Sequence, residues 1–360
     1  MGIKIKNNGD LLQSSEELVK KARKVLFSMK SYTGSFKYLP VNVANSLFDS
    51  MVKPIAIYNS EITYMDTYIS LYRAKKRADV SGRNIDFLSF TDKSCIEKLH
   101  LTFCKYVLGT SKTSSNLAVR TELGRYPLEL QIKTQTLLYL SRLLNRKNNP
   151  LLDEAFLLTK HLDSEGVYCW YTYVKSIANE AGLDISDISN IGENQIPKLR
   201  KTLKSTFEKF YKDIYNKKIE AIDDNSKLFL YKSLKQSLNS EFYLKSKCFE
   251  FKNFKTKFRI SNHSLLIEKG RFSNIPRENR LCSKCNVVED EMHFLLHCTR
   301  NIEIRKIYFE KNKTESCSIG FEALSDKEKI NFMLNPSTLQ QVTNTGSFLK
   351  QSLALRAGDL

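Results

Sequence analysis

The stretch Leu281–Cys298 reads LCSKCNVVEDEMHFLLHC and brings three cysteines and two histidines close together in the chain. A gap of two residues suits a tight turn that presents two sulfurs to one ion, and a histidine and a cysteine five positions apart can approach that ion from a helical turn. Three thiolates and one imidazole complete a tetrahedron and leave no position for water. We therefore predict one structural zinc ion that contributes to folding. Its predicted ligands are Cys282, Cys285, His293 and Cys298.

Two alternatives stay open for this stretch. The cysteines could be small core residues that bind no metal. His297 competes with His293 for the imidazole position, but its place beside Cys298 makes a tetrahedral approach awkward, so we prefer His293. The acidic run 289–291 is expected to face solvent or to support the ligands, because three thiolates are available to the metal.

The charge of the whole chain points to a polyanionic partner. The 360 residues include 57 Lys and Arg against 39 Asp and Glu, a formal net charge of +18. RNA or DNA is the simplest partner for such an excess. A basic protein without a polyanion is the main alternative, and a membrane surface is a weaker one. The absence of a long apolar run or a secretory signal, together with scattered unpaired cysteines, predicts a soluble protein of the nucleus or cytoplasm.

Apolar periodicity predicts a mainly all-α fold, with helical regions followed by a small zinc-knuckle domain. Strand signals are few and short. The expected helices cover residues 14–29, 41–53, 92–108, a long segment from Pro127, 197–221, 228–244 and 325–334. In the second of these helices Val43, Leu47, Phe48 and Met51 are expected to be buried, and in the helix 197–221 Phe207, Phe210, Ile214 and Ala221. Ser325 and Glu328 have the spacing of a capping box.

Four consecutive segments are expected along the chain. Residues 1–80 would hold a hairpin remnant and thumb-like helices, and residues 81–190 a helical connector. Residues 191–335 would form a basic helical region that contains the zinc knuckle at 282–298, and residues 336–360 a tail. The polar stretch 182–197 is rich in Gly, Ser, Asn and Asp, so it is expected to be a linker or boundary.

Basic residues interleave with aromatic ones just before the predicted metal site. In residues 244–263, LKSKCFEFKNFKTKFRISNH, four Phe alternate with Lys and Arg, a composition that proteins use to bind single-stranded nucleic acid. The alternative is that the Phe residues fill a core while the Lys residues form a solvated face. The candidate nucleic-acid contacts are Lys252, Lys255, Lys257, Arg259, Arg271, Arg277 and Arg280.

No catalytic constellation emerges from the sequence. Asp223 and Asp224 are adjacent, but they follow the end of a predicted helix and resemble the turn before the next one, whereas a two-metal site needs carboxylates fixed on a strand hairpin. No nucleophile elbow, P-loop or zincin motif is present. We expect the chain not to be an enzyme on its own.

The zinc spacing, preceded by RISNHSLLIEKGR at 259–271, resembles the C-terminal region of non-LTR (LINE-type) retrotransposon reverse transcriptases. The segments LFDSMVKPIAIYNSEI at 47–62, IEKLHLTFCKYVLG at 96–109 and ELGRYPLELQI at 122–132 are similar to the region that follows the polymerase palm in that family. The resemblance implies a thumb, a connector and a cysteine-rich domain that grips template RNA or target DNA. It also implies an upstream polymerase domain as partner, with its catalytic aspartates before residue 1, so no polymerase activity is expected here. A zinc-stabilised protein-interaction module, derived from such an element, is the alternative function.

Overall fold

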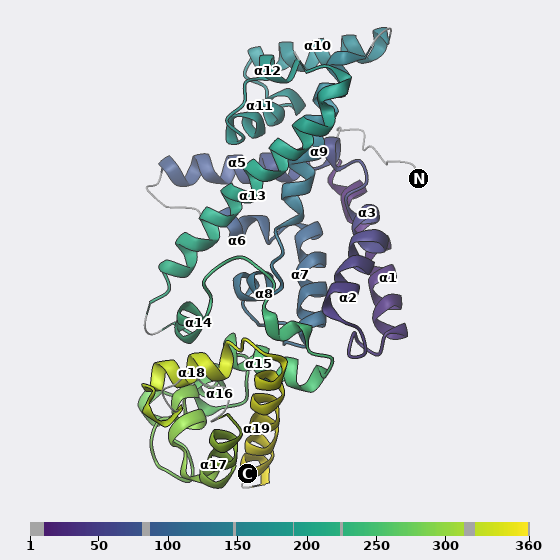
Figure 1. Ribbon diagram of the computed structural model, residues 1–360. Helices are drawn as coiled ribbons and strands as arrows, with labels where there is room; N and C mark the ends of the chain where they lie inside the picture. The colour runs from purple at the N-terminus through teal and green to yellow at the C-terminus, as the bar shows by residue number, and fades with distance from the viewer. Residues whose placement is uncertain are drawn as a thin grey trace. The chain divides into compact units, whose positions relative to one another are not determined.

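The computed structural model describes residues 11–80, 87–146, 149–189, 191–223, 226–312 and 321–358. Over these residues the chain is a succession of helices, and the one extended pairing they contain is the antiparallel bridge between Leu281 and Val288 (Figure 1). The predicted mainly all-α fold is therefore confirmed.

Two compact units make up the chain, and each combines separate stretches of sequence. Unit 1 comprises residues 1–29, 46–103 and 126–214, and unit 2 comprises residues 30–45, 104–125 and 215–360. Three long helices contain residues of both units: α1 (Leu12–Tyr32), α7 (Cys95–Leu108) and α13 (Ile196–Glu220). The four consecutive segments expected from the sequence stay a prediction.

In unit 1 the helix α9 (Leu128–Asn145) packs against α4 (Ser60–Thr63), α11 (Trp170–Glu180) and α12 (Ile185–Ser189). The last of these lies inside the stretch 182–197 that was expected to be a linker, and its Ile188 is fully buried, so this short helix packs within unit 1. The remaining elements of this unit are η1 (Phe48–Val52), α3 (Lys53–Ala56), α5 (Met65–Val80), α6 (Phe87–Thr91), α10 (Pro150–Ser164) and η2 (Glu193–Gln195).

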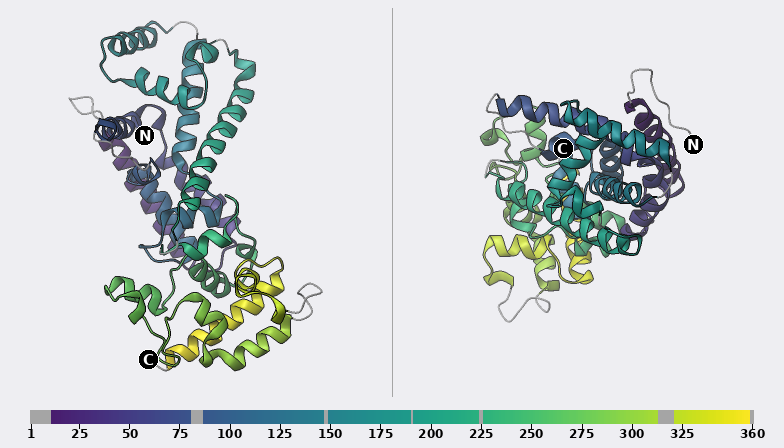
Figure 2. Two further views of the ribbon diagram at one scale, coloured as in Figure 1. Left: turned by 90° about the vertical axis from the view of Figure 1, so that its left-hand side faces the viewer. Right: turned by 90° about the horizontal axis from the view of Figure 1, so that it is seen from above.

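Unit 2 is organised around the C-terminal helix α19 (Leu339–Gly358), which packs against α15 (Phe249–Arg259) and α17 (Ile302–Asn312). In Figure 2 the same group of helices is seen from two further directions. Within the residues 336–360, expected to be a tail, α19 buries Val342, Phe348 and Leu349. A side chain at Gly346 would collide with the ring of Phe251, so this glycine lets α19 approach α15 closely.

The rest of unit 2 consists of short elements around that helical group. They are α2 (Val41–Leu47), α8 (Asn116–Leu123), α14 (Phe229–Leu234), η3 (Phe242–Lys245), α16 (Leu266–Phe272), η4 (Arg277–Asn279), η5 (His293–His297), η6 (Thr299–Asn301), η7 (Phe321–Ala323) and α18 (Asp326–Leu334). The first of them extends beyond Asn45, where the residues of unit 1 resume. Phe258 of α15, Phe294 and Leu295 of η5 and Leu349 of α19 belong to one apolar core.

Two sequence predictions about helices are confirmed in detail. The stripe of α7 is buried at Ile96, Leu99 and Phe103, and Gly109 follows the helix with a φ of 63°, the left-handed conformation expected of a C-terminal cap. In α18 the side chains and backbone N–H groups of Ser325 and Glu328 form the predicted capping box.

The predicted buried face of the second helix is wrong at two positions. Val43 is 38% exposed and Met51 is 48% exposed, whereas Ala44, Phe48 and Val52 are buried. At Met51 the reason is a π-helical stretch, η1, that follows α2. A π turn spans one more residue than an α turn, so the inward position moves from 51 to 52.

Two predictions about the basic segment after residue 196 also need correction. In α13, Phe207 is buried as expected, but Phe210 and Ile214 are only half-buried and Ala221 is exposed beyond the helix end. The stripe is completed instead by residues at intervals of four, Leu199, Leu203, Tyr211 and Tyr215. The helix expected over 228–244 ends at Leu234, because Lys235 adopts extended backbone geometry.

Candidate metal centre

The first two cysteines of the predicted metal site lie on a tight hairpin. The N–H of Cys282 donates to the carbonyl of Val287 at 2.7 Å, and the N–H of Asn286 donates to the carbonyl of Cys282 at 2.9 Å. Asn286 has a φ of 56°, a left-handed conformation that asparagine tolerates better than most residues. The turn brings Cys285 back toward Cys282, as the two-residue gap predicts.

The other two candidate ligands are joined by a π turn. The element η5 begins at His293, and the N–H of Cys298 donates to the carbonyl of His293 at 2.7 Å. In a regular α-helix, residues five apart point in directions that differ by about 140°. The wider π turn reduces that divergence, so the four-residue gap between His293 and Cys298 becomes compatible with one shared ion.

These four side chains converge on one point (the cluster is called the knuckle site below). Their ligand atoms all lie within 4.8 Å of one another. The sulfur of Cys298 is 3.9 Å from the sulfur of Cys282 and 3.9 Å from that of Cys285. Sulfurs bound to one zinc ion at about 2.3 Å would be roughly 3.8 Å apart in a tetrahedron. The arrangement can therefore hold a metal ion.

An unpartnered nitrogen is the second indication of a metal ligand. His293 is 8% exposed, and its Nε2 is buried without a hydrogen-bond partner. A buried polar atom left unpaired costs about 1–3 kcal/mol. A metal ion would satisfy this nitrogen, so the donor set fits the predicted ion.

Local chemistry affects the proton affinity of each ligand differently. Burial lowers the pKa of His293, which favours the neutral imidazole that a metal requires. Burial raises the pKa of Cys298 to about 12, so metal binding must displace its proton. Burial acts in the same direction on Cys285, but hydrogen bonds from the hydroxyl and the N–H of Thr299 outweigh it and lower the pKa of that thiol.

Side chains around the knuckle site fix its two halves. The carboxylate of Asp290 accepts a hydrogen bond from the N–H of His293 at 2.8 Å. The guanidinium of Arg305 donates to the carbonyls of Leu295 at 3.1 Å and Cys298 at 2.7 Å. These contacts hold the π turn from both ends, and sequence spacing alone gave no indication of Arg305.

The rival histidine is turned away from the cluster. Nε2 of His297 lies 2.7 Å from the carboxylate of Asp326, and the His297 side chain is 52% exposed. Of the acidic run, Asp290 supports a ligand as expected. Glu289 does not face solvent. It is buried and forms a bidentate ion pair with Arg356 of α19. Glu291 accepts from Ser261 and pairs with His263.

Three of the predicted nucleic-acid contacts lie in the interior of unit 2. Lys252 is 5% exposed, and Lys255 and Arg259 are fully buried. Arg259 donates three hydrogen bonds of 3.0–3.1 Å to the carboxylate of Glu122 and also pairs with Glu241. Cations buried in this way do not reach a phosphate in this conformation.

Lys255 is buried, and no acidic residue among those that the structure describes pairs with it. Its ammonium group donates to the carbonyl of Met333 at 2.9 Å, and burial lowers its pKa well below the ordinary value. Its neighbour Lys257 is half-buried, and burial lowers its pKa as well.

The other three predicted contacts lie nearer the surface. Arg271 is half-buried and its Nε lies 3.1 Å from the carboxylate of Glu268. Arg280 donates to the carbonyls of Ile275 at 2.9 Å and Ile267 at 3.0 Å. Arg277 is exposed, and no ion pair joins it to another of the described residues. It is the predicted cation best placed to meet an external anion.

The aromatic residues of this segment match neither alternative drawn from the sequence. Phe258 is buried and stacks on Phe294 with ring centroids 5.5 Å apart, whereas Phe249, Phe251 and Phe254 are half-buried. The cations of α15 are thus more buried than most of its aromatic side chains. For Arg259 the cause is Glu122, an acidic partner on α8 that lies 137 positions earlier in the chain.

The adjacent aspartates weighed as a catalytic pair are only partly described by the structure: Asp223 follows α13, and Asp224 lies outside the described residues. The scattered cysteine Cys317 also lies outside them. Across the part of the chain that the structure describes, no helix is both long and apolar enough to cross a bilayer. Comparison of the chain with protein-family models, with curated proteins and with solved structures finds no match.

Proposed function

We propose that the knuckle site binds one zinc ion and that the chain is a nucleic-acid-binding C-terminal region of a non-LTR retrotransposon reverse transcriptase. The observation that carries the metal assignment is the convergence of three sulfurs on a buried, unpartnered imidazole nitrogen. The surface charge and the family resemblance support the nucleic-acid function.

Zinc suits this donor set better than other common ions. Thiolate and imidazole ligands in a tetrahedral arrangement favour zinc, whereas magnesium and calcium prefer oxygen. Four protein ligands fill the coordination sphere, so the ion would be structural and would activate no water. It would connect the hairpin at Cys282 and Cys285 to the π turn and so stabilise this part of unit 2.

The charge that surrounds the knuckle site favours an anionic partner. Arg277 precedes it, and Lys284 lies on the turn between the first two cysteines; both are exposed. Glu289 pairs with Arg356, and Glu291 accepts from Ser261 and lies 2.8 Å from Nε2 of His263, so both carboxylates already have partners within the protein. With a net charge of +18 on the chain, contacts to phosphate are the simplest use of the exposed cations.

The resemblance of residues 47–62, 96–109 and 122–132 to the post-palm region supplies the family context. On this proposal the chain grips template RNA or target DNA and has no polymerase activity of its own. A primer-extension assay on the isolated chain should therefore give no product.

The proposal is tested by metal analysis and by nucleic-acid binding in a salt series. The purified chain should contain one zinc ion, and the logarithm of its affinity for labelled RNA or DNA should fall linearly with the logarithm of salt concentration. Affinity that is absent, or unchanged between low and high salt, would remove the nucleic-acid function. A protein partner that co-purifies after nuclease treatment would then favour the interaction-module alternative.

A further inference from the structure

A pocket in unit 2 lies apart from the four ligands of the knuckle site. It has a volume of about 830 Å³ and is lined by residues of α14 and α18 together with Met292, which directly precedes His293. Its lining is mostly apolar. This size lies within the range of about 300–1,000 Å³ that small-ligand pockets occupy, so it can accept a planar group such as a nucleobase.

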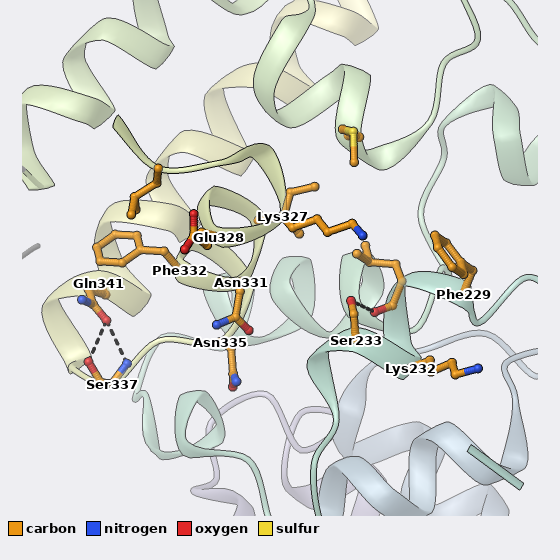
Figure 3. A pocket seen from close by; sticks show the side chains of 14 residues that line it. Phe229, Lys232, Ser233, Lys327, Glu328, Asn331, Phe332, Asn335, Ser337 and Gln341 are labelled. Atoms are coloured by element: carbon orange, nitrogen blue, oxygen red, sulfur yellow. Dashed lines mark hydrogen bonds between the residues drawn. The ribbon is translucent and has the colours of Figure 1, made fainter. Parts of the chain in front are cut away.

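Two aromatic side chains face the pocket from opposite sides, as Figure 3 shows for Phe229 and Phe332. Phe229 is 47% exposed, and its ring stacks on no other ring among the described residues. The ring of Phe332 contacts Phe321, at a centroid distance of 5.1 Å. An exposed aromatic face at the mouth of an apolar pocket is what a stacked base requires.

Two asparagine side chains between these rings have unused hydrogen-bonding capacity. Asn331 and Asn335 line the pocket, and neither side-chain amide hydrogen-bonds to any residue that the structure describes. Gln341 differs, because its carbonyl oxygen accepts from the N–H of Ser337 at 2.8 Å (Figure 3). A free amide can donate to and accept from the edge of a base, which apolar ligands do not offer.

Cations adjoin this pocket on two sides. Lys327 is exposed, lines the pocket and forms no ion pair within the described residues. A second, smaller pocket of about 220 Å³ shares Phe229 and Met292 with the first and is also lined by Arg277. A base that enters the pocket and stacks on Phe229 would thus have Lys327 and Arg277 at the border of its site, where they could meet its flanking phosphates.

The acidic residues that line the smaller pocket already have hydrogen-bond or ion-pair partners within the protein. Glu268 pairs with Lys227 and Arg271, with charged atoms 3.1 Å apart in each pair. Asp290 accepts from the N–H of His293, and Glu291 pairs with His263. The ion pairs of Glu268 reduce the repulsion that a phosphate would meet here. Arg277 forms no ion pair with another described residue and can contact that phosphate.

We infer that the pocket between α14 and α18 holds an unstacked base of a single-stranded nucleic acid, with Phe229 as its stacking platform and Asn331 and Asn335 at its edge. The inference rests on the proposed nucleic-acid function and adds to it the form of the partner. A base paired within a duplex cannot insert between the rings, so the pocket selects single strands or unpaired ends.

The test compares two exposed phenylalanines in the zinc-loaded full chain. Phe229→Ala removes the platform, whereas Phe272→Ala removes a side chain that is 67% exposed and lines neither pocket. For a fluorescein-labelled single-stranded RNA, Phe229→Ala should weaken binding roughly ten-fold, within the range known for loss of one stacked base. The affinity for a blunt duplex of the same sequence should not change, and Phe272→Ala should resemble the wild type with both probes.

A second measurement needs no substitution. The wild-type chain is photo-crosslinked to a single strand that contains 4-thiouridine, and the crosslinked peptide is identified by mass spectrometry. Crosslinks in α14 or α18 support the inference. Equal responses of the two alanine variants, or crosslinks confined to other elements, would overturn it while salt-dependent binding of the wild type preserves the proposed function. If the wild type binds neither probe, the proposed function fails as well.

Discussion

The region around α15 and the knuckle site both bury polar groups, but they satisfy them in different ways. Arg259 is fully buried, and protein partners surround its guanidinium: Glu122, Glu241 and the carbonyl of Leu334. At the knuckle site, the nitrogen of His293 has no partner and the sulfurs face one another. The polar groups of the first region are satisfied by the protein itself, whereas the second has side chains that could hold a metal ion. Burial of polar side chains therefore indicates a ligand only where their partners are missing.

The largest effect should follow from loss of a metal ligand. Cys285→Ser should lose the zinc ion and disrupt the knuckle, because zinc binding in small sites is worth on the order of 10 kcal/mol at neutral pH. Metal content and thermal unfolding measure both consequences. Cys248→Ser is the matched control, since Cys248 is also half-buried but lies outside the cluster. Retention of zinc by Cys285→Ser would show that the knuckle site is not the metal centre.

A smaller loss of stability is expected at the ion pair of α15. Arg259→Met leaves the carboxylate of Glu122 buried without its cation, which typically costs about 3–5 kcal/mol. Chemical denaturation should register this loss, with the zinc content unchanged. If the free energy of unfolding changes by less than about 1 kcal/mol, Arg259 is not the interior cation described above.

Lys255→Met on the same helix should behave differently from Arg259→Met. Lys255 pairs with no acid in the described part of the chain. Its removal therefore deletes one hydrogen bond and also a desolvation cost, and stability should change by no more than about 1 kcal/mol.

The pH dependence of Lys255 gives a separate readout. Burial lowers the pKa of this lysine from about 10.5 in the folded chain, so the unfolded chain binds its proton more tightly. Wild-type stability should therefore fall as pH decreases from 10.5 toward the lowered pKa. Lys255→Met should flatten this part of the profile. An unaltered slope would mean that the lysine is not buried.

The smallest effect on folding is expected at Arg277. Because this side chain is exposed, Arg277→Gln should change stability by no more than about 0.5 kcal/mol. If Arg277 contacts a phosphate, the substitution should reduce the salt slope of nucleic-acid binding by about one. Glu278→Gln, which alters the neighbouring exposed acid, should leave that slope unchanged or slightly larger. Identical slopes for Arg277→Gln and the wild type would exclude the contact.

A feature could be predicted from the sequence when the residues that form it lie close together along the chain. The spacing of Cys282, Cys285 and Cys298 is local, and so is the capping box at Ser325, so both were predictable. The burial of Arg259 depends on Glu122, which no local pattern identifies. The exposure of Met51 depends on a π turn that periodicity does not signal.

The C-terminal helix shows a second reason why prediction failed. Residues 339–358, where the sequence analysis expected a tail, are rich in small and polar side chains. Their packing depends on close approach at Gly346 and on the pairing of Arg356 with Glu289, and both involve partners from other elements. The ion pair between Arg356 and Glu289 therefore joins the knuckle to α19, a helix whose packing cannot be predicted from its own sequence.

The most direct test of the metal assignment is X-ray absorption at the zinc edge of the purified full-length chain, combined with its zinc content. One ion per chain is expected, coordinated by three sulfurs at about 2.3 Å and one nitrogen at about 2.1 Å. A chain that folds without zinc, or an ion surrounded mainly by oxygen, would contradict the assignment of Cys282, Cys285, His293 and Cys298 as a structural metal centre.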